Sequence, residues 1–265
     1  EAGFGSDMGA EKFMHIKAAN SGKAPDCVVM NVTVRSMKLH GGAFGSRGGY
    51  RPTKEQLENE DVDAVLRGAQ GNLDRHIKNM SGFGMPVLVS INRFYSDTDA
   101  ELDALKMAAQ KSGATHVSLT EVHANGGQGG EDLAKAVVAA VHDHVANGRP
   151  FTPLFTPETP VLDKMNAIAT RIYKAEGVEI STSAMKQLAK FQAWGYDHLP
   201  VCMAKTQYSF SHDPGKLGAP VGFTIPVKEF RLNAGAGFIV AILGNMMTMP
   251  GLPKRPAALD MDMDE

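Results

Sequence analysis

The run PVLVSINRF, residues 86–94, decides how we expect this chain to fold, because it is apolar on successive residues rather than on alternate ones. A strand covered on one face alternates apolar and polar side chains, whereas a strand covered on both faces is apolar nearly throughout. Two runs of the same kind flank it, CVVMNVTV at 27–34 and ATHVSLTEV at 114–122. The three runs predict buried strands of a mostly parallel sheet.

Helical patterns separate and follow these runs, as they do in a chain of βαβ units. Between 61 and 80 apolar residues recur every three or four positions, which predicts a helix with one apolar face. Further helices are predicted over 99–113, ended by Gly113, and over 131–148, ended by Gly148. The order β-α-β-α-β-α predicts an α/β fold for this part of the chain.

A domain boundary is predicted near residue 150, where GRPFTPLFTPETP at 148–160 is rich in glycine and proline. Beyond it, Thr159 and Pro160 predict the start of a helix, and Ser181 the start of another. Short apolar runs at 199–205, 222–227 and 237–244 predict strands. We therefore expect an α/β region over 1–150 and a smaller α+β domain over 151–265.

Composition excludes several classes of function. The 265 residues carry 27 basic and 29 acidic side chains, a net charge of −2, so there is no global attraction to nucleic acid or to anionic membranes. Two cysteines in apolar runs favour buried thiols in a reducing compartment. Without a run of 18 apolar residues or a signal peptide, we expect a soluble, cytoplasmic protein. The chain opens on EAGFGSDMGAEKF, as if in mid-structure, so we expect a missing segment upstream.

The stretch VTVRSMKLHGGAFGSRGGYR, residues 32–51, has the layout of a strand that enters a phosphate-binding loop. A loop of that type needs G-x-x-x-x-G-K-[ST], because the lysine neutralises the phosphates and the hydroxyl holds Mg²⁺. No G-K-[ST] occurs anywhere in the chain. Two readings remain open: a mobile surface loop at the rim of the molecule, or an accessory contact to a ligand.

The ends of the second and third predicted strands carry candidate binding residues, because ligands of open parallel sheets collect at the carboxyl ends of strands. Asn92 has a carboxamide that can pair with a base edge, although it serves equally well as a loop cap. His123 can stack on a heterocycle or lie half-exposed. The glycines of GGQGG, 126–130, either admit an anion at a helix N-terminus or form a tight turn.

Metal and triad chemistry find no support in the spacing of residues. His142 and His144 lie two apart on a predicted helix and do not face each other. Ser211, His212 and Asp213 are consecutive, which is not how a nucleophilic triad is arranged. We predict no metal ligands in this chain.

Several longer segments, taken together, resemble the formate–tetrahydrofolate ligase family, also called 10-formyltetrahydrofolate synthetases. The segments are EAGFGSDMGAEKF at 1–13, VTVRSMKLHGG at 32–42, INRFYSDTDAEL at 91–102, GGQGGEDLA at 126–134, LPVCMAKTQYSFSHDP at 199–214 and TMPGLPKRPA at 248–257. They occur in the family's order and span almost the whole chain. They begin around the middle of the family pattern, so the resemblance is to the C-terminal half of a ligase.

The resemblance implies an ATP-dependent ligase that joins formate to tetrahydrofolate through formyl phosphate. It implies a P-loop NTPase-like core whose phosphate loop and catalytic residues lie in the N-terminal half, which is not in this chain. The fragment is therefore expected to be inactive alone. The alternative is a non-catalytic module that binds nucleotide or folate, or one half of a split ligase.

The resemblance also implies a crevice that holds the nucleotide base and the pterin ring. The residues implied to line it are Phe4, Asn92, Phe94, Tyr95, Leu119, Glu121 and His123. Arg35 and Lys38 are candidate anion contacts. Two positions depart from the family pattern, because relatives often have Trp at 123 and Pro at 95. The stacking area at the folate site is accordingly expected to be smaller or rebuilt.

The implied ligands are ATP with Mg²⁺, formate and tetrahydrofolate as substrates, and a monovalent cation at a site that the sequence does not place. The implied partners are the missing N-terminal half and further copies of the same chain in a homo-oligomer. Neither nucleic acid nor a membrane is expected as a partner.

Overall fold

The computed structural model describes residues 2–45, 51–244, 255–256 and 259. Strands β1 (Val28–Val32), β2 (Val87–Asn92) and β3 (His116–Thr120) form one parallel sheet in the order β1-β2-β3. Val32 pairs with Ile91, and Asn92 with Thr120, so the three strands end at nearly the same level. The α/β fold with a parallel sheet, predicted from the three apolar runs, is confirmed.

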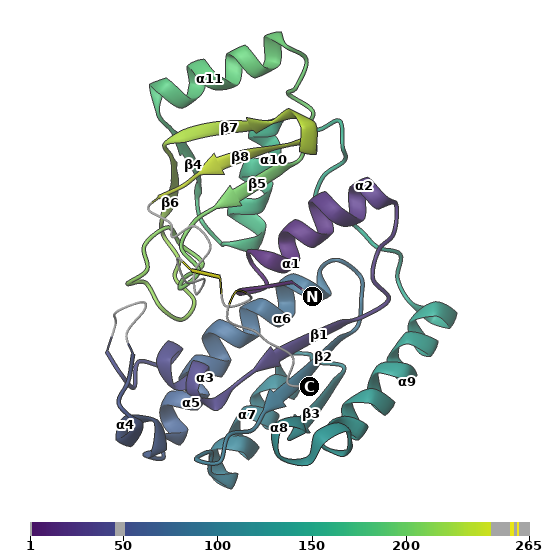
Figure 1. Ribbon diagram of the computed structural model, residues 1–265, viewed down its shortest axis with the longest axis vertical. Coiled ribbons are helices and arrows are strands. Elements are labelled where there is room, and N and C mark those ends of the chain that lie inside the picture. The colour runs from purple at the N-terminus through teal and green to yellow at the C-terminus, as the bar shows by residue number, and fades with distance from the viewer. Residues whose placement is uncertain (1, 46–50, 245–254, 257–258, 260–265) are drawn as a thin grey trace.

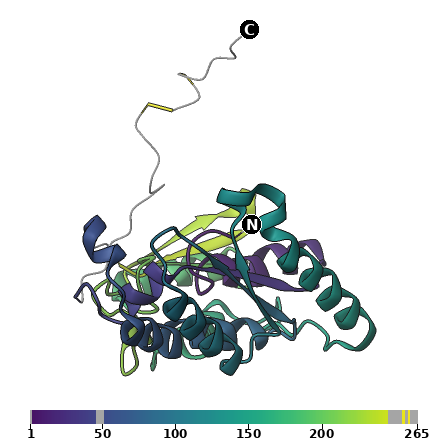
Figure 2. The same cartoon turned by 90° about the horizontal axis from the view of Figure 1, so that it is seen from below.

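Helices connect the strands as expected for βαβ units. The predicted helix between β1 and β2 is a continuous stretch of α5 (Val62–Gly68), the π-helical turn η2 (Ala69–Leu73) and α6 (Asp74–Ser81). Helix α7 (Asp99–Lys111) begins at a capping box of Thr98 and Glu101. Helix α9 (Glu131–Asn147) lies at the outer edge of the molecule, packed on β2 and β3 (Figures 1 and 2). The remaining elements here are α1 (Gly9–Lys12), η1 (Phe13–Ala18), α2 (Ala19–Ser21), α4 (Lys54–Glu58), α8 (Val122–Asn125) and η3 (Gly126–Gly130).

The first predicted strand is too long, because its last residues start a helix. Thr33 is the N-cap of α3 (Val34–His40): its hydroxyl oxygen accepts a hydrogen bond from the Ser36 amide. The segment VRSMKLH is therefore a helix and not a strand end. Two glycines let α3 pack against α5 without side chains between them. A Cβ on Gly41 would overlap the carbonyl oxygen of Ala64, and a Cβ on Gly68 would overlap that of Met37.

Residues after 150 form two smaller sheets. Strand β4 (Gly177–Ile180) pairs in parallel with β6 (Thr224–Val227), and β8 (Phe238–Ile242) lies between β5 (Val201–Ala204) and β7 (Glu229–Asn233). Strands β5, β6 and β8 match the three predicted runs, whereas β4 and β7 were not predicted. The helical elements are α10 (Val161–Ala167), η4 (Ile168–Ile172), α11 (Thr182–Ala193) and η5 (Ala234–Ala236). Helix α10 begins one residue later than predicted, with Pro160 in the N-cap position.

The two groups of sheets form two lobes, with α1, η1 and α2 between them (Figure 1). We call residues 27–148 the first lobe and residues 151–244 the second lobe. One face of η2 and α6 joins them: Asn72, Arg75 and Asn79 donate hydrogen bonds to carbonyl oxygens at 218, 219–220 and 172 of the second lobe. Buried apolar residues of both lobes belong to one contiguous core. The domain boundary near 150 stays a prediction.

Two sequence segments of interest are only partly described. Residues 46–50 of the glycine-rich loop, which was predicted to be mobile, lie outside the described part of the chain. Most of TMPGLPKRPA at 248–257 lies outside it as well. Among the residues that are described, no helix is both long and apolar enough to cross a lipid bilayer.

The close contact between α3 and α5 gives a test of the fold. We expect Gly68→Ala to lower the free energy of unfolding by about 1–3 kcal/mol, because the new methyl group has no room beside the Met37 carbonyl. Gly71→Ala is the matched control, since a Cβ there meets only ordinary contacts at 3.6 Å or more. It should be neutral or stabilising by up to about 1 kcal/mol. Urea unfolding of the three proteins measures both effects; equal stabilities of the two variants would contradict the close packing.

Candidate functional site

The carboxyl edge of the first sheet brings together most of the predicted binding residues. Asn92 ends β2, and Phe94 and Tyr95 follow it in the next turn. Leu119 lies in β3, with Glu121 and His123 directly after that strand. Because the strands are parallel and end at one level, these side chains share one edge of the sheet. Tyr95 is 78% exposed and Leu119 39% exposed, so this edge offers apolar surface to solvent.

Arg35 joins this edge from the first turn of α3. Its guanidinium lies 3.8 Å from the centroid of the Phe94 ring, a cation–π contact, and Nη2 is 3.5 Å from the hydroxyl of Ser96. Its Nε is buried without a hydrogen-bond partner among the residues that the structure describes, as is Oδ1 of Asp97. The amide of Phe94 donates to the other oxygen of Asp97 at 2.8 Å, which fixes the turn. Arg35 is thus a cation held over an aromatic ring next to the carboxyl ends of β1 and β2.

Lys38, the second candidate anion contact, is engaged within the fold. Its Nζ is buried, 2.7 Å from the Glu101 carboxylate, and donates to the carbonyl oxygens of Leu57 and Asn59 at 3.2 and 2.8 Å. Glu101 in turn accepts from the Asp61 amide at 2.8 Å. All three ammonium protons have acceptors, so we do not carry Lys38 into the proposed site.

Glu121 and Tyr95 also have partners in the chain. Arg93 lies between Glu121 and Asp99, at 3.4 and 3.2 Å, and both of these carboxylates are partly or largely exposed. The Tyr95 hydroxyl donates to Glu58 at 2.7 Å. Surface contacts of this kind are weak and exchange readily with solvent or ligand. They leave the aromatic face of Tyr95 open.

Phe4 lies apart from the other aromatic residues, in the turn that precedes α1. Its backbone has φ of 63°, in the left-handed region that non-glycine residues seldom adopt, and its side chain is 59% exposed. The turn borders a cavity of about 570 Å³ formed by this turn, β1, α3, η2 and α6, and residues 207–210. The cavity reaches Val32 and Ser36 at the carboxyl end of β1. Phe4 and the carboxyl end of β1 therefore border the same cavity.

One wall of this cavity is the outer edge of β1. Among the described residues, β1 pairs with β2 on one side and with no strand on the other. Its backbone amide and carbonyl groups on that side are available to a further strand. The side chain of Val29 is 44% exposed at the same edge.

Two histidines form part of the cavity's polar wall. Nδ1 of His76 lies 2.6 Å from the Ser6 hydroxyl, and its ring packs against Phe210 at a tilt of 34°, with centroids 4.5 Å apart. Nδ1 of His40 accepts a hydrogen bond from the Gly218 amide at 3.1 Å. Burial lowers the pKa of His40 to about 4, so the ring is neutral at pH 7 and carries its proton on Nε2.

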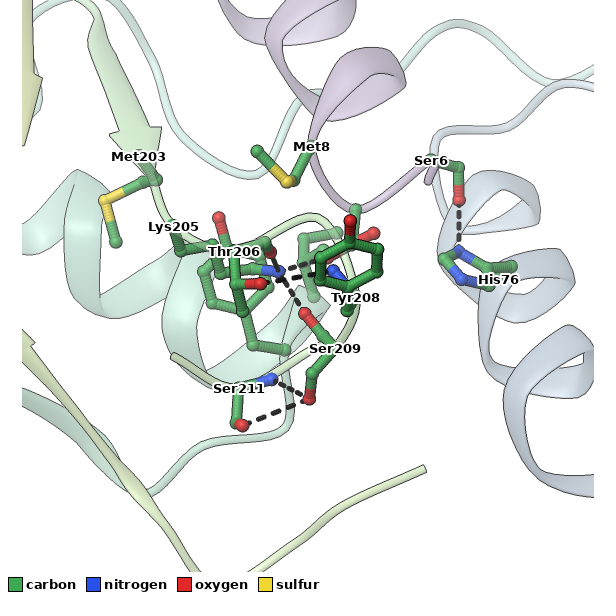
Figure 3. Close-up of polar contacts among 12 residues, drawn as sticks. Ser6, Met8, His76, Met203, Lys205, Thr206, Tyr208, Ser209 and Ser211 are labelled. Atoms are coloured by element: carbon green, nitrogen blue, oxygen red, sulfur yellow. Dashed lines mark hydrogen bonds and ion pairs between the residues drawn. The ribbon is translucent and has the colours of Figure 1, made fainter. Parts of the chain in front are cut away.

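A buried ion pair joins the turn before α1 to the residue that follows β5, and Figure 3 shows its lysine, Lys205. Nζ of Lys205 is 2.6 Å from Oδ2 of Asp7, and the two residues are 1% and 5% exposed. Lys205 also donates to the carbonyl oxygens of Thr206 and Ser209, so its ammonium group is saturated. Burial alone would raise the pKa of the Asp7 carboxyl, but the charge of Lys205 and its hydrogen bond hold that pKa below the usual value.

Sequence reasoning missed the roles of Ser6, Asp7, His76 and Lys205. A signal for Lys205 was available: a lysine directly after the buried run VCMA has to be partnered if the strand enters the core. The identity of the partner, 198 positions away, could not be read from the sequence. Within the described ranges, no group of three or more His, Cys, Asp or Glu residues is placed to hold a metal ion.

Comparison with known proteins places this geometry in context. The family model for formate–tetrahydrofolate ligases matches residues 1–265. The chain is 50% identical over 265 residues to a formate–tetrahydrofolate ligase of Leuconostoc citreum (strain KM20), and 47% identical over 264 residues to one of Acidiphilium cryptum (strain JF-5). Each alignment covers 100% of this chain and 45% of the relative. The chain thus spans a little under half the length of these relatives.

The depressed pKa of His40 predicts a pH dependence of stability. The unfolded chain binds a proton near pH 6.5, whereas the folded chain does so only near pH 4, so stability is lost as the pH falls through this window. The loss should reach roughly 3 kcal/mol at the acid end.

His40→Asn keeps an acceptor near the position of Nδ1 but cannot titrate. Its free energy of unfolding should therefore fall less steeply between pH 6.5 and pH 4 than that of the wild type. His142→Asn, at an exposed position on α9, is the control. Identical pH profiles for wild type and His40→Asn, from urea unfolding, would contradict the depressed pKa.

Proposed function

This chain belongs to the formate–tetrahydrofolate ligase family, and we propose that it forms one part of an ATP-dependent ligase that joins formate to tetrahydrofolate. In the proposed reaction a formate oxygen attacks the γ-phosphorus of ATP, and ADP leaves. The N10 amine of tetrahydrofolate then takes the formyl group from formyl phosphate, phosphate leaves, and the nitrogen loses a proton. Both steps depend on positioning and on stabilisation of charge.

The part played by this chain is to hold the flat heterocycles of the substrates. The observation that carries the proposal is the carboxyl edge of the first sheet, where Phe94, Leu119 and His123 come together from two neighbouring strands. Aromatic and aliphatic faces at such an edge suit a purine or pterin ring, and the proposed contacts to the substrates include the ring of Phe4, which borders the cavity that reaches the end of β1. The guanidinium of Arg35, fixed on the Phe94 ring, supplies a positive charge for an anionic group of the same ligand.

The phosphate chemistry belongs to chain that lies outside these 265 residues. No G-K-[ST] occurs here, and Lys38 is saturated by Glu101 and two carbonyl groups. The proposed core is P-loop NTPase-like, with Mg²⁺ neutralising the phosphates of ATP when bound. The open edge of β1 suits a strand of the remaining half, since its backbone groups on that side have no strand partner among the described residues. A requirement for a monovalent cation and assembly into a homo-oligomer stay predictions.

The competing proposal is a split ligase or a non-catalytic binding module. The open edge of β1 fits a second polypeptide as well as a covalently linked half. Intact mass of the natural polypeptide separates the two: a linked ligase should have a mass of roughly 60 kDa, the size of two such halves. A native mass near 28.3 kDa would favour the split form.

We predict that the purified 265-residue chain releases no ADP in a formate- and tetrahydrofolate-dependent manner. The reason is that the chain contains no G-K-[ST] phosphate loop. A coupled assay for ADP, with and without each substrate, measures this. Turnover by the isolated chain would overturn the assignment of phosphate chemistry to the other half.

The heterocycle site predicts the effect of removing one aromatic face. In the natural polypeptide, Phe94→Ala should weaken substrate binding by about 1–3 kcal/mol. This is the scale of a lost stacking contact. Trp194→Ala is the control, because Trp194 is 61% exposed on the far lobe next to α11. Values of KM for ATP and tetrahydrofolate report the effect. If neither changes in Phe94→Ala, Phe94 is not part of the site.

A further inference from the structure

We infer that His76 and Lys205 are positioning residues: from two different lobes, they hold the turn that presents Phe4 to the cavity. We call residues 3–9 the Phe4 turn. The inference rests on the proposed function only in one respect, namely that Phe4 contacts a substrate. Neither His76 nor Lys205 is assigned a role by the family resemblance or by the comparisons.

The Phe4 turn is strained and tightly folded. Phe4 has a left-handed backbone, with φ of 63°, although its exposed side chain gains little from packing. The amides of Met8 and Gly9 both donate to the Gly5 carbonyl at 3.0 Å. A Cβ on Gly9 would overlap the carbonyl oxygen of Gly3, so the chain passes itself at close range. A conformation of this kind persists only where surrounding contacts impose it.

The first contact comes from the first lobe. The Ser6 hydroxyl lies 2.6 Å from Nδ1 of His76, on α6, and the two side chains point toward each other in Figure 3. The His76 ring is itself held, because it packs at a tilt against Phe210 and lies close to Gly5, where a Cβ would be 3.3 Å from ring atom Cε1. The ring cannot move without displacing the turn.

The second contact comes from the second lobe. Asp7, next to Ser6 in the chain, forms the buried ion pair with Lys205, which follows β5. The remaining protons of Lys205 are donated to the carbonyl oxygens of Thr206 and Ser209. Lys205 thereby fixes both the Phe4 turn and the loop whose residues Gln207 and Tyr208 line the cavity.

Adjacent residues of one strained turn are therefore bound to different lobes. The position of Phe4 depends on both contacts, since release of either one leaves the left-handed turn held at a single point. Phe4 is the group that meets the ligand in the proposed function, whereas His76 and Lys205 act through Ser6 and Asp7. This arrangement predicts that loss of either contact weakens substrate binding more than it slows the chemical step.

The experiment on the first contact uses two substitutions of His76 in the natural polypeptide. His76→Asn keeps a hydrogen-bonding atom near the position of Nδ1, and His76→Gln places it near the position of Nε2. Hydrogen exchange of the Met8, Gly9 and Glu11 amides reports directly on the turn, independently of activity. We expect exchange about tenfold faster in His76→Gln and close to wild type in His76→Asn. KM for the substrate that contacts Phe4 should rise about tenfold in His76→Gln, with kcat changed less than twofold.

The second contact needs a variant that folds. Lys205→Met alone leaves the Asp7 carboxylate buried without a partner, so the double variant Asp7→Leu/Lys205→Met is the better choice, because apolar replacement of a buried pair is often tolerated. We expect faster exchange of the same amides and a raised KM in the double variant. Lys78→Met, at the exposed pair with Asp74 on α6, is the control and should change neither.

The outcomes separate the positioning role of His76 and Lys205 from the proposed contact between Phe4 and a substrate. Exchange at wild-type rates in both His76→Gln and the double variant would overturn the inference, whatever the activity. Equal rates in His76→Asn and His76→Gln would also overturn it for His76, because the contact through Nδ1 would then not matter. Faster exchange with unchanged KM for every substrate would support the two contacts and remove Phe4 from the binding site, which contradicts the proposed function instead.

Discussion

A buried charge sets the conditions for the rest of this structure. Lys205 directly follows core strand β5, where an unpaired cation would be far too costly, and within the described part of the chain only Asp7 forms an ion pair with it. Because Asp7 belongs to the turn before α1, this need brings the first residues of the chain against the second lobe. The same rule operates elsewhere: Lys38 is neutralised by Glu101, and Lys164 donates to three backbone carbonyl groups. Buried lysines thus determine which distant segments meet.

The two regions that we propose to bind ligands differ in how the fold forms them. The carboxyl edge of the first sheet is a direct result of parallel strand topology, which delivers Phe94 and Leu119 to one place. The region around Phe4 depends on contacts between lobes and on the open edge of β1. Both regions lie in a chain that belongs to the ligase family and spans 45% of the length of the two relatives.

Much of the fold could be predicted from local pattern. The apolar runs predicted β1, β2 and β3, and Gly113 and Gly148 were correct helix ends. Prediction failed at Thr33, because threonine is common both in strands and at helix N-caps. Its β-branched side chain suggested a strand, whereas its hydroxyl caps α3. It also failed for β4 and β7, which are short and partly polar. The sites followed the same division. The resemblance pointed to the sheet edge, whereas the pairs Ser6–His76 and Asp7–Lys205 span 70 and 198 positions and leave no periodic trace.

The open edge of β1 has a consequence for the behaviour of the chain in solution. Val28–Val32 is an apolar strand with one side unpaired among the described residues, and it carries no lysine, proline or bulge to discourage further pairing. The unpaired backbone groups of such an edge can pair with a strand of another protein segment or with β1 of a second copy of the chain. Pairing between copies of the chain through this strand is therefore favoured, and it should increase with protein concentration.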